Sequence, residues 1–109
     1  MKIRLNQELS DKKAADIEWS RTVKDRDSRK CVVCGSTDRP NAHHIIPREI
    51  QCFRHHVDNG LTLCVSHHKF DIKNSAHHNP GAFHQWLKRN KPELYERCVE
   101  RTDTILNGI

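Results

Sequence analysis

The sequence predicts a small α+β fold, in which one N-terminal helix and two C-terminal helices flank a short two-stranded core. Three observations favour this fold. Apolar residues recur at helical spacing near the N-terminus, short β-branched segments occupy the middle of the chain, and a proline opens each of two helical stretches near the C-terminus. A chain of 109 residues is long enough for one domain with a modest core. We therefore expect a single domain over residues 1–109.

The N-terminal segment, residues 1–30, is expected to be helical from Asp11 to about Arg29. Ser10 is available as the N-cap, because its hydroxyl can accept a hydrogen bond from a free amide of the first turn. Lysine and arginine residues cover most of the remaining helix surface. The predicted buried stripe repeats every four residues and consists of Ala15, Trp19 and Val23.

Two short pairs of metal-binding residues lie in the middle of the chain: Cys31 with Cys34, and Cys64 with His67. A two-residue gap lets both side chains of a pair reach one ion from a tight turn. Three cysteines and one histidine complete a closed tetrahedral zinc site, so we expect a structural zinc ion. A second possibility has His77 or His78 as the fourth ligand. With 35% hydrophobic and 30% charged residues, the core is small, and a structural metal would stabilise it.

Residues 31–78 are expected to form a zinc-clasped ββα core. The pairs are separated by residues 35–63, which is longer than the linker of a small DNA-reading zinc finger. The zinc is therefore expected to clasp the base of a loop that carries His43 and His44. The predicted elements are a turn at 35–40, a strand at 41–46 ended by Pro47, a loop at 48–58, an Asn59-Gly60 turn, a strand at 61–63 and a helix at 65–75.

Two helices are predicted in residues 79–109. Asn79 is a good cap for the first helix, and Pro80 suits the first helical position. The apolar face of this helix, which extends to about Arg89, consists of Phe83, Trp86 and Leu87. Pro92 opens the second helix. One side of that helix is lined by Leu94, Cys98, Thr102 and Ile105 or Leu106.

Charge and cysteine content limit the class of protein. The net charge of +5 and the pI of about 9.1 favour a polyanionic partner. The N-terminus has no apolar signal-like region, and no apolar run approaches the length of a membrane span. Five cysteines, three of them at metal spacing, suit a reducing cytoplasm in which Cys52 and Cys98 are free thiols.

Three stretches resemble the HNH endonucleases, also called ββα-metal nucleases. These stretches are Ala42 to Pro47 (AHHIIP), Asn59 to Cys64 (NGLTLC) and His67 to Lys69 (HHK). The letters of the family name fall on His44, Asn59 and His68. The two metal-binding pairs are similar to those of the zinc-containing branch, although many members have a cysteine where this chain has His67. Zinc accepts either ligand. The resemblance covers about residues 19–73.

The resemblance implies a metal-dependent DNA endonuclease that leaves 5′-phosphate and 3′-hydroxyl ends. It implies that His44 is the general base and that His43 and His68 bind one catalytic divalent cation. A neutral imidazole with a pKa near 7 suits removal of a proton from water. Two imidazoles favour Mn²⁺, Co²⁺, Ni²⁺ or Zn²⁺ over Mg²⁺, although Mg²⁺ or Mn²⁺ is what a cell supplies. Asn59 is expected to orient His44 through hydrogen bonds to backbone.

Contacts to DNA are expected to be made mostly with phosphates. Lys69 and Lys73 are four residues apart on the predicted helix, so both can lie along one phosphate strand. Arg48 can approach from the opposite side. The remaining histidines are expected to serve at the surface, in caps or against the DNA backbone, with no catalytic role: His55, His56, His77, His78 and His84.

Alternative functions remain open at this point. By itself, the His43-His44 pair would be ordinary for a strand, and Asn59 before Gly60 would be ordinary for a turn. A non-catalytic zinc-dependent nucleic-acid-binding module is the second hypothesis, and a partner-binding adaptor with a relic site is the third. The leading hypothesis is a stand-alone nuclease, monomeric or weakly dimeric, of the size found in phage or mobile-element genomes.

Overall fold

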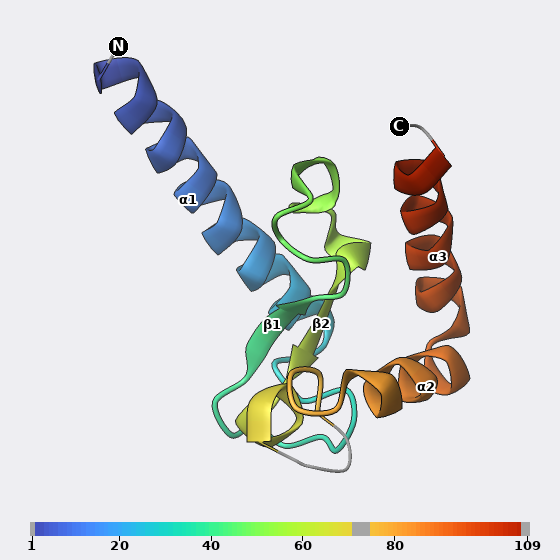
Figure 1. Cartoon of the computed structure of the whole chain (residues 1–109). Coiled ribbons are helices and arrows are strands. Elements are labelled where there is room, and N and C mark those ends of the chain that lie inside the picture. The colour runs from blue at the N-terminus through green and yellow to red at the C-terminus, as the bar shows by residue number, and fades with distance from the viewer. Residues whose placement is uncertain (1, 71–74, 108–109) are drawn as a thin grey trace.

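The computed structural model describes residues 2–70 and 75–107, and all structural statements below concern these residues. A two-stranded sheet lies in the middle of the molecule, with α1 on one side and α2 and α3 on the other (Figure 1). The predicted small α+β fold is confirmed. No helix in the described ranges is long and apolar enough to cross a membrane. The main elements are α1 (Lys2–Arg26), β1 (Asn41–His44), β2 (Gly60–Leu63), α2 (Pro80–Asn90) and α3 (Pro92–Asn107).

The sheet separates two sets of side chains. The strands are antiparallel, with His43 opposite Leu61 and His44 opposite Gly60. Because successive strand residues point to opposite faces, His43 and His44 face different neighbours. His43 contacts the ring of Phe83 from α2, whereas His44 stacks on Trp19 from α1.

Helix α1 begins well before the predicted start at Asp11. Ser10 lies inside the helix rather than at its cap, because the preceding residues are themselves good helix formers, including lysine, arginine, leucine, glutamine and glutamate. The helix also ends before Arg29, since Ser28 and Arg29 both adopt a positive φ of 56°. The predicted buried stripe is confirmed at Trp19 and Val23, which are 5% and 0% exposed.

The connection between the strands differs from the predicted loop at 48–58 followed by a turn at Asn59-Gly60. Two short 3-10 helices, Gln51–Phe53 and Val57–Asn59, lie within it, and Gly60 is the first residue of β2 in extended conformation. Position 60 requires glycine because there is no room for a side chain. A Cβ atom at Gly60 would lie 2.6 Å from the Trp19 side chain and 2.7 Å from that of Val23. Gly60 therefore allows α1 to pack directly on the sheet.

Strand β1 is shorter than predicted. It ends at His44 rather than Ile46, because the backbone turns toward Asn59 after that point. The amide of Ile45 donates to the Asn59 carbonyl at 3.1 Å, and the amide of Ile46 donates to Asn59 Oδ1 at 2.7 Å. A side chain thus replaces the next rung of the sheet.

The segment after β2 is only partly the predicted helix. A π-helix covers Ser66–Phe70, and Ser75 is not helical. Residues 71–74 of the predicted helix lie outside the described residues. Ala76 lies beside the first turn of the π-helix, since its amide donates to the His67 carbonyl at 2.9 Å. This hydrogen bond brings residues 76 and 77 beside the π-helix.

The C-terminal helices agree closely with the prediction. Asn79 caps α2, with its Oδ1 accepting a hydrogen bond from the Ala82 amide at 3.2 Å. Pro80 and Pro92 open the two helices as expected. The main core lies between α2, β2 and the two metal-binding pairs. Its buried members are Cys31, Leu61, Leu63, Cys64, Ala76, Phe83 and Leu87.

Candidate functional site

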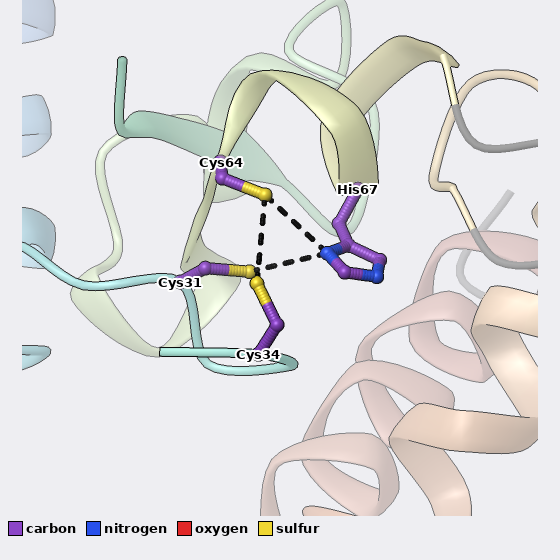
Figure 2. Close-up of side chains that lie close together, drawn as sticks. All are labelled: Cys31, Cys34, Cys64 and His67. Atoms are coloured by element: carbon purple, nitrogen blue, oxygen red, sulfur yellow. Dashed lines mark hydrogen bonds between the residues drawn. The ribbon is translucent and has the colours of Figure 1, made fainter. Parts of the chain in front are cut away.

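Four side chains from the two predicted metal-binding pairs converge on one point. The three sulfur atoms and the Nδ1 atom of His67 are turned toward a common centre (Figure 2). The Cys34 and Cys64 sulfurs lie 3.8 Å apart, and His67 Nδ1 lies 3.3 Å from the Cys64 sulfur and 3.7 Å from that of Cys31. All four candidate ligand atoms lie within 4.8 Å of one another.

These separations suit a tetrahedral zinc ion. Zinc bonds of about 2.3 Å to sulfur and about 2.0–2.1 Å to nitrogen place ligand atoms roughly 3.6–3.8 Å apart. Local structure holds the first pair in shape, because the Gly35 amide donates to the Cys31 carbonyl at 2.8 Å and Gly35 has a φ of +76°. The cluster of Cys31, Cys34, Cys64 and His67 could therefore bind zinc, and its fourth position is filled by His67.

A second cluster consists of His43, His68 and His77. One candidate ligand atom from each lies within 4.8 Å of the others. The Nε2 atoms of His68 and His77 are 3.0 Å apart, and the His43 ring lies 5.2 Å and 5.1 Å from those two rings, centroid to centroid. The three histidines come from β1, the π-helix and the segment before α2.

The chemistry of this cluster fits a divalent cation. Burial lowers the pKa of His43 to about 3 and that of His68 to about 4, so both imidazoles are neutral and keep a lone pair for a metal. His68 Nδ1 is buried and, among the described residues, has no hydrogen-bond partner. Neutral imidazole is the form of histidine that binds metals.

His77 belongs to this second cluster rather than to the zinc-type cluster, where the sequence had left it as an alternative fourth ligand. It is exposed, as the sequence predicts, but its ring lies beside those of His43 and His68. The cause is a backbone hydrogen bond, since the amide of His77 donates to the His68 carbonyl at 3.0 Å. His78, the other alternative zinc ligand, is exposed and belongs to neither cluster. The only hint in the sequence was the density of histidines around residues 67–78.

His44 is held from two sides. Its ring lies flat against the indole of Trp19, with centroids 3.8 Å apart and planes 8° from parallel. Its Nε2 lies 2.9 Å from the carbonyl oxygen of Arg54. Because a carbonyl only accepts, Nε2 must carry the proton, and the lone pair of a neutral His44 is then on Nδ1. Burial lowers the pKa of His44, so this neutral form predominates at pH 7.

Asn59 binds the backbone of the loop between the strands. Its side chain is fully buried, with Nδ2 donating to the carbonyls of Ile46 and Phe53 at 3.1 Å each. Together with the bond from the Ile46 amide, the side chain fastens the two ends of the loop that carries Arg54.

The histidine cluster opens into a cavity of about 600 Å³. His44 lines the same cavity as His43, His68 and His77. Arg48 and Lys69 also lie on its wall, whereas Lys73 lies outside the described residues. A larger cavity of about 790 Å³ lies between the end of α1 and the start of α3, but none of the three clustered histidines lines it. The smaller cavity is therefore the one that contains the candidate metal-binding histidines and His44.

Residues 31–71 match the HNH endonuclease family. The match confirms the resemblance proposed from the sequence, and the first cluster fits the zinc-containing branch. The matched segment contains His43, His44, Asn59 and His68. No curated protein and no solved structure matches the chain.

Two parts of the candidate site come from outside the matched HNH segment. His77 follows the segment and completes the histidine cluster, and Trp19 precedes it and stacks on His44. Trp19 was predicted as a core residue only, since its spacing with Ala15 and Val23 is that of an ordinary apolar stripe. Helix α1 therefore contributes to the site as well as to the core.

Proposed function

We propose that this chain is a metal-dependent DNA endonuclease, which hydrolyses phosphodiester bonds to 5′-phosphate and 3′-hydroxyl ends. The observation that carries the proposal is the shared cavity. Three imidazoles that could bind a cation line it together with a fourth histidine, His44, whose neutral form has its lone pair on Nδ1. A purely structural metal site would not require this fourth group.

His44 is the proposed general base. Its Nδ1 accepts a proton from a water molecule, while the Arg54 carbonyl holds the proton on Nε2 and stabilises the resulting imidazolium. The proposed role of Asn59 is to keep the loop, and hence this carbonyl, in place. Neither residue needs to change conformation for the proton transfer.

His43, His68 and His77 are the proposed ligands of the catalytic cation. When bound, a divalent cation would neutralise charge on a non-bridging phosphate oxygen and on the departing 3′-oxygen. Three imidazoles favour Mn²⁺, Co²⁺, Ni²⁺ or Zn²⁺, and Mg²⁺ would bind more weakly. Cys31, Cys34, Cys64 and His67 would hold a separate structural zinc ion.

Arg48 and Lys69 are proposed to contact DNA phosphates at the cavity wall, and Lys73 is proposed to extend this contact. A single cavity acts on one strand, so a monomer would nick DNA, and double-strand cleavage would need a weak homodimer or two successive nicks. The proposed DNA contacts are with the backbone, because Arg48 and Lys69 come from separate segments of the wall rather than from one helix face suited to reading bases.

The test is cleavage of supercoiled plasmid by the zinc-loaded protein in Mn²⁺, Mg²⁺ or EDTA. The wild type should nick the plasmid with added metal and not in EDTA. His44→Ala should lower the rate about 10²–10⁴-fold, the usual share of a general base, while preserving fold and DNA affinity. His78→Ala is the matched control, because His78 is an exposed histidine outside both clusters. DNA binding without metal-dependent cleavage by the wild type would favour the non-catalytic binding module instead.

A further inference from the structure

The loop between the strands is fastened to α1 by an ion pair. The Arg54 guanidinium donates to both carboxylate oxygens of Asp16, each at 2.7 Å. The Arg54 side chain is 12% exposed and that of Asp16 is 31% exposed, so the guanidinium is largely shielded from water while the carboxylate is partly exposed. The same guanidinium donates to the Arg48 carbonyl at 3.1 Å. One side chain thus joins α1 to two points of the loop.

The backbone of Arg54 is the part that reaches His44. Its carbonyl accepts the hydrogen bond from His44 Nε2, so the position of this carbonyl sets the direction of the imidazole. Asn59 fixes the interior side of the loop, at Ile46 and Phe53. In the described residues, the Arg54 side chain donates hydrogen bonds to Asp16 and to the Arg48 carbonyl. Of these two partners, only Asp16 belongs to a helix or strand, namely α1.

Trp19 constrains the same imidazole from the face of the ring. Its indole stacks on His44, and its Nε1 donates to the His56 carbonyl at 2.7 Å, two residues beyond Arg54. Asp16 and Trp19 are three residues apart and so lie on the same side of α1. The ring stacking and the Arg54 ion pair therefore act on His44 from one rigid helix.

We propose that Asp16 and Trp19 are positioning residues for His44, so that helix α1 directs the imidazole through the Arg54 carbonyl and through ring stacking. This inference rests on the proposed role of His44 as the general base. Neither residue lines the cavity that would hold the cation, so neither is placed to touch the cation or the substrate directly. Asp16 also pairs with His55, whose Nε2 lies 2.7 Å from its Oδ1. A general base that is misdirected by a fraction of an ångström loses rate without loss of substrate binding.

The decisive variant is Asp16→Asn, which removes the charge but keeps the shape of the side chain. In single-turnover plasmid cleavage, we expect a rate about 10- to 100-fold lower than wild type at unchanged DNA affinity. The effect should vanish when Asp16→Asn is added to His44→Ala, because no base is left to direct. Asp25→Asn is the matched control, since Asp25 lies on the same helix and forms an exposed ion pair with Arg29, beyond the end of the helix. The control should cleave at the wild-type rate.

Two results would overturn the inference while leaving the nuclease proposal intact. One is a wild-type rate in Asp16→Asn. The other is an equal relative loss of cleavage rate when Asp16→Asn is added to the wild type and to His44→Ala. That result would indicate a general effect of the substitution on folding or on DNA binding. If the wild type itself does not cleave, the proposed function fails, and the positioning is decided by a measurement that needs no activity.

That measurement is the tautomer of His44 by ¹H–¹⁵N NMR of the imidazole nitrogens. In the folded, zinc-loaded wild type, His44 should carry its proton on Nε2 alone. In Asp16→Asn the two tautomers should mix, and in Asp25→Asn they should not. Trp19→Phe keeps an aromatic ring but loses the hydrogen bond to His56, and we expect an intermediate loss of the Nε2–H form. An unchanged His44 spectrum in both Asp16→Asn and Trp19→Phe would refute the positioning role.

Discussion

The Nε2 atoms of His68 and His77 face each other at 3.0 Å, although the two residues are nine positions apart in the chain. Two ring nitrogens at this distance form a hydrogen bond only if one of them carries a proton, whereas a cation would use the lone pairs of both. With His43 they form a three-imidazole cluster at the wall of the His44 cavity. This contact makes His77 the most informative residue for testing the proposed catalytic ion.

His77→Ala should weaken binding of the second metal ion and abolish most cleavage. Loss of a partner that only supports a metal ligand costs about 10–100-fold in affinity, so loss of a ligand should cost at least as much. Isothermal titration of the zinc-loaded protein with Mn²⁺ measures the affinity, and His78→Ala is the control. Equal Mn²⁺ affinity in His77→Ala and wild type would exclude His77 from the ligand set.

Cys31→Ser or Cys64→Ser should unfold or precipitate the protein, because a structural zinc ion contributes directly to the free energy of folding. Both cysteines are also buried in the main core, at 3% exposure each. Cys52→Ser is the control, since Cys52 is exposed and distant from the zinc cluster in sequence. Circular dichroism and metal analysis of the purified proteins measure fold and zinc content. A folded wild type that contains no zinc would contradict the assignment of the cluster.

Lys69→Ala should weaken DNA binding most strongly at low salt. Each phosphate neutralised on duplex DNA contributes about −0.9 to the slope of log affinity against log salt. Lys69→Ala should therefore flatten the slope by about one, and adding Lys73→Ala should flatten it by about two. Lys13→Ala on the exposed part of α1 is the control. If the double variant lost affinity for one preferred sequence only, these lysines would be reading bases rather than phosphates.

Asp58→Asn should destabilise the fold by detaching α3 from the loop between the strands. Arg101 donates to both Asp58 oxygens at 2.6 and 2.7 Å. Both side chains remain partly exposed, so we expect a loss of about 1–2 kcal/mol in the free energy of unfolding. Urea denaturation measures this loss, and Asp38→Asn in the exposed Asp38–Arg39 pair is the control.

The pH dependence of this contribution follows from the sign of the pKa shift. The hydrogen bonds from Arg101 lower the pKa of Asp58 below its usual value of about 3.9, so the folded state favours the ionised form. The stabilisation is complete above the unfolded pKa and is lost only as the pH falls through the lowered value. The difference between wild type and Asp58→Asn should therefore not shrink between about pH 8 and pH 5. A difference that shrinks within this window would contradict the assignment.

Local patterns in the sequence were enough for several parts of the fold and of the site. The starts of α2 and α3 follow from Asn79-Pro80 and Pro92, because capping and the fixed φ of proline act within one turn. The zinc-type cluster follows from two pairs with a two-residue gap, since each pair reaches an ion from its own turn. Alternation along β1 places His43 and His44 on different faces whatever the rest of the chain does.

Tertiary structure decided everything that depends on residues distant in sequence. Gly60 is required by the close approach of Trp19, not by a turn, and this spacing exists only once α1 packs on the sheet. His77 joins His68 through a hydrogen bond between their backbones, which brings together two residues nine positions apart. Asp16 and Trp19 reach Arg54 and His44 across more than twenty residues of chain. A sequence pattern records which side chains share a face of one element, but which elements meet is set by the packing of the whole core.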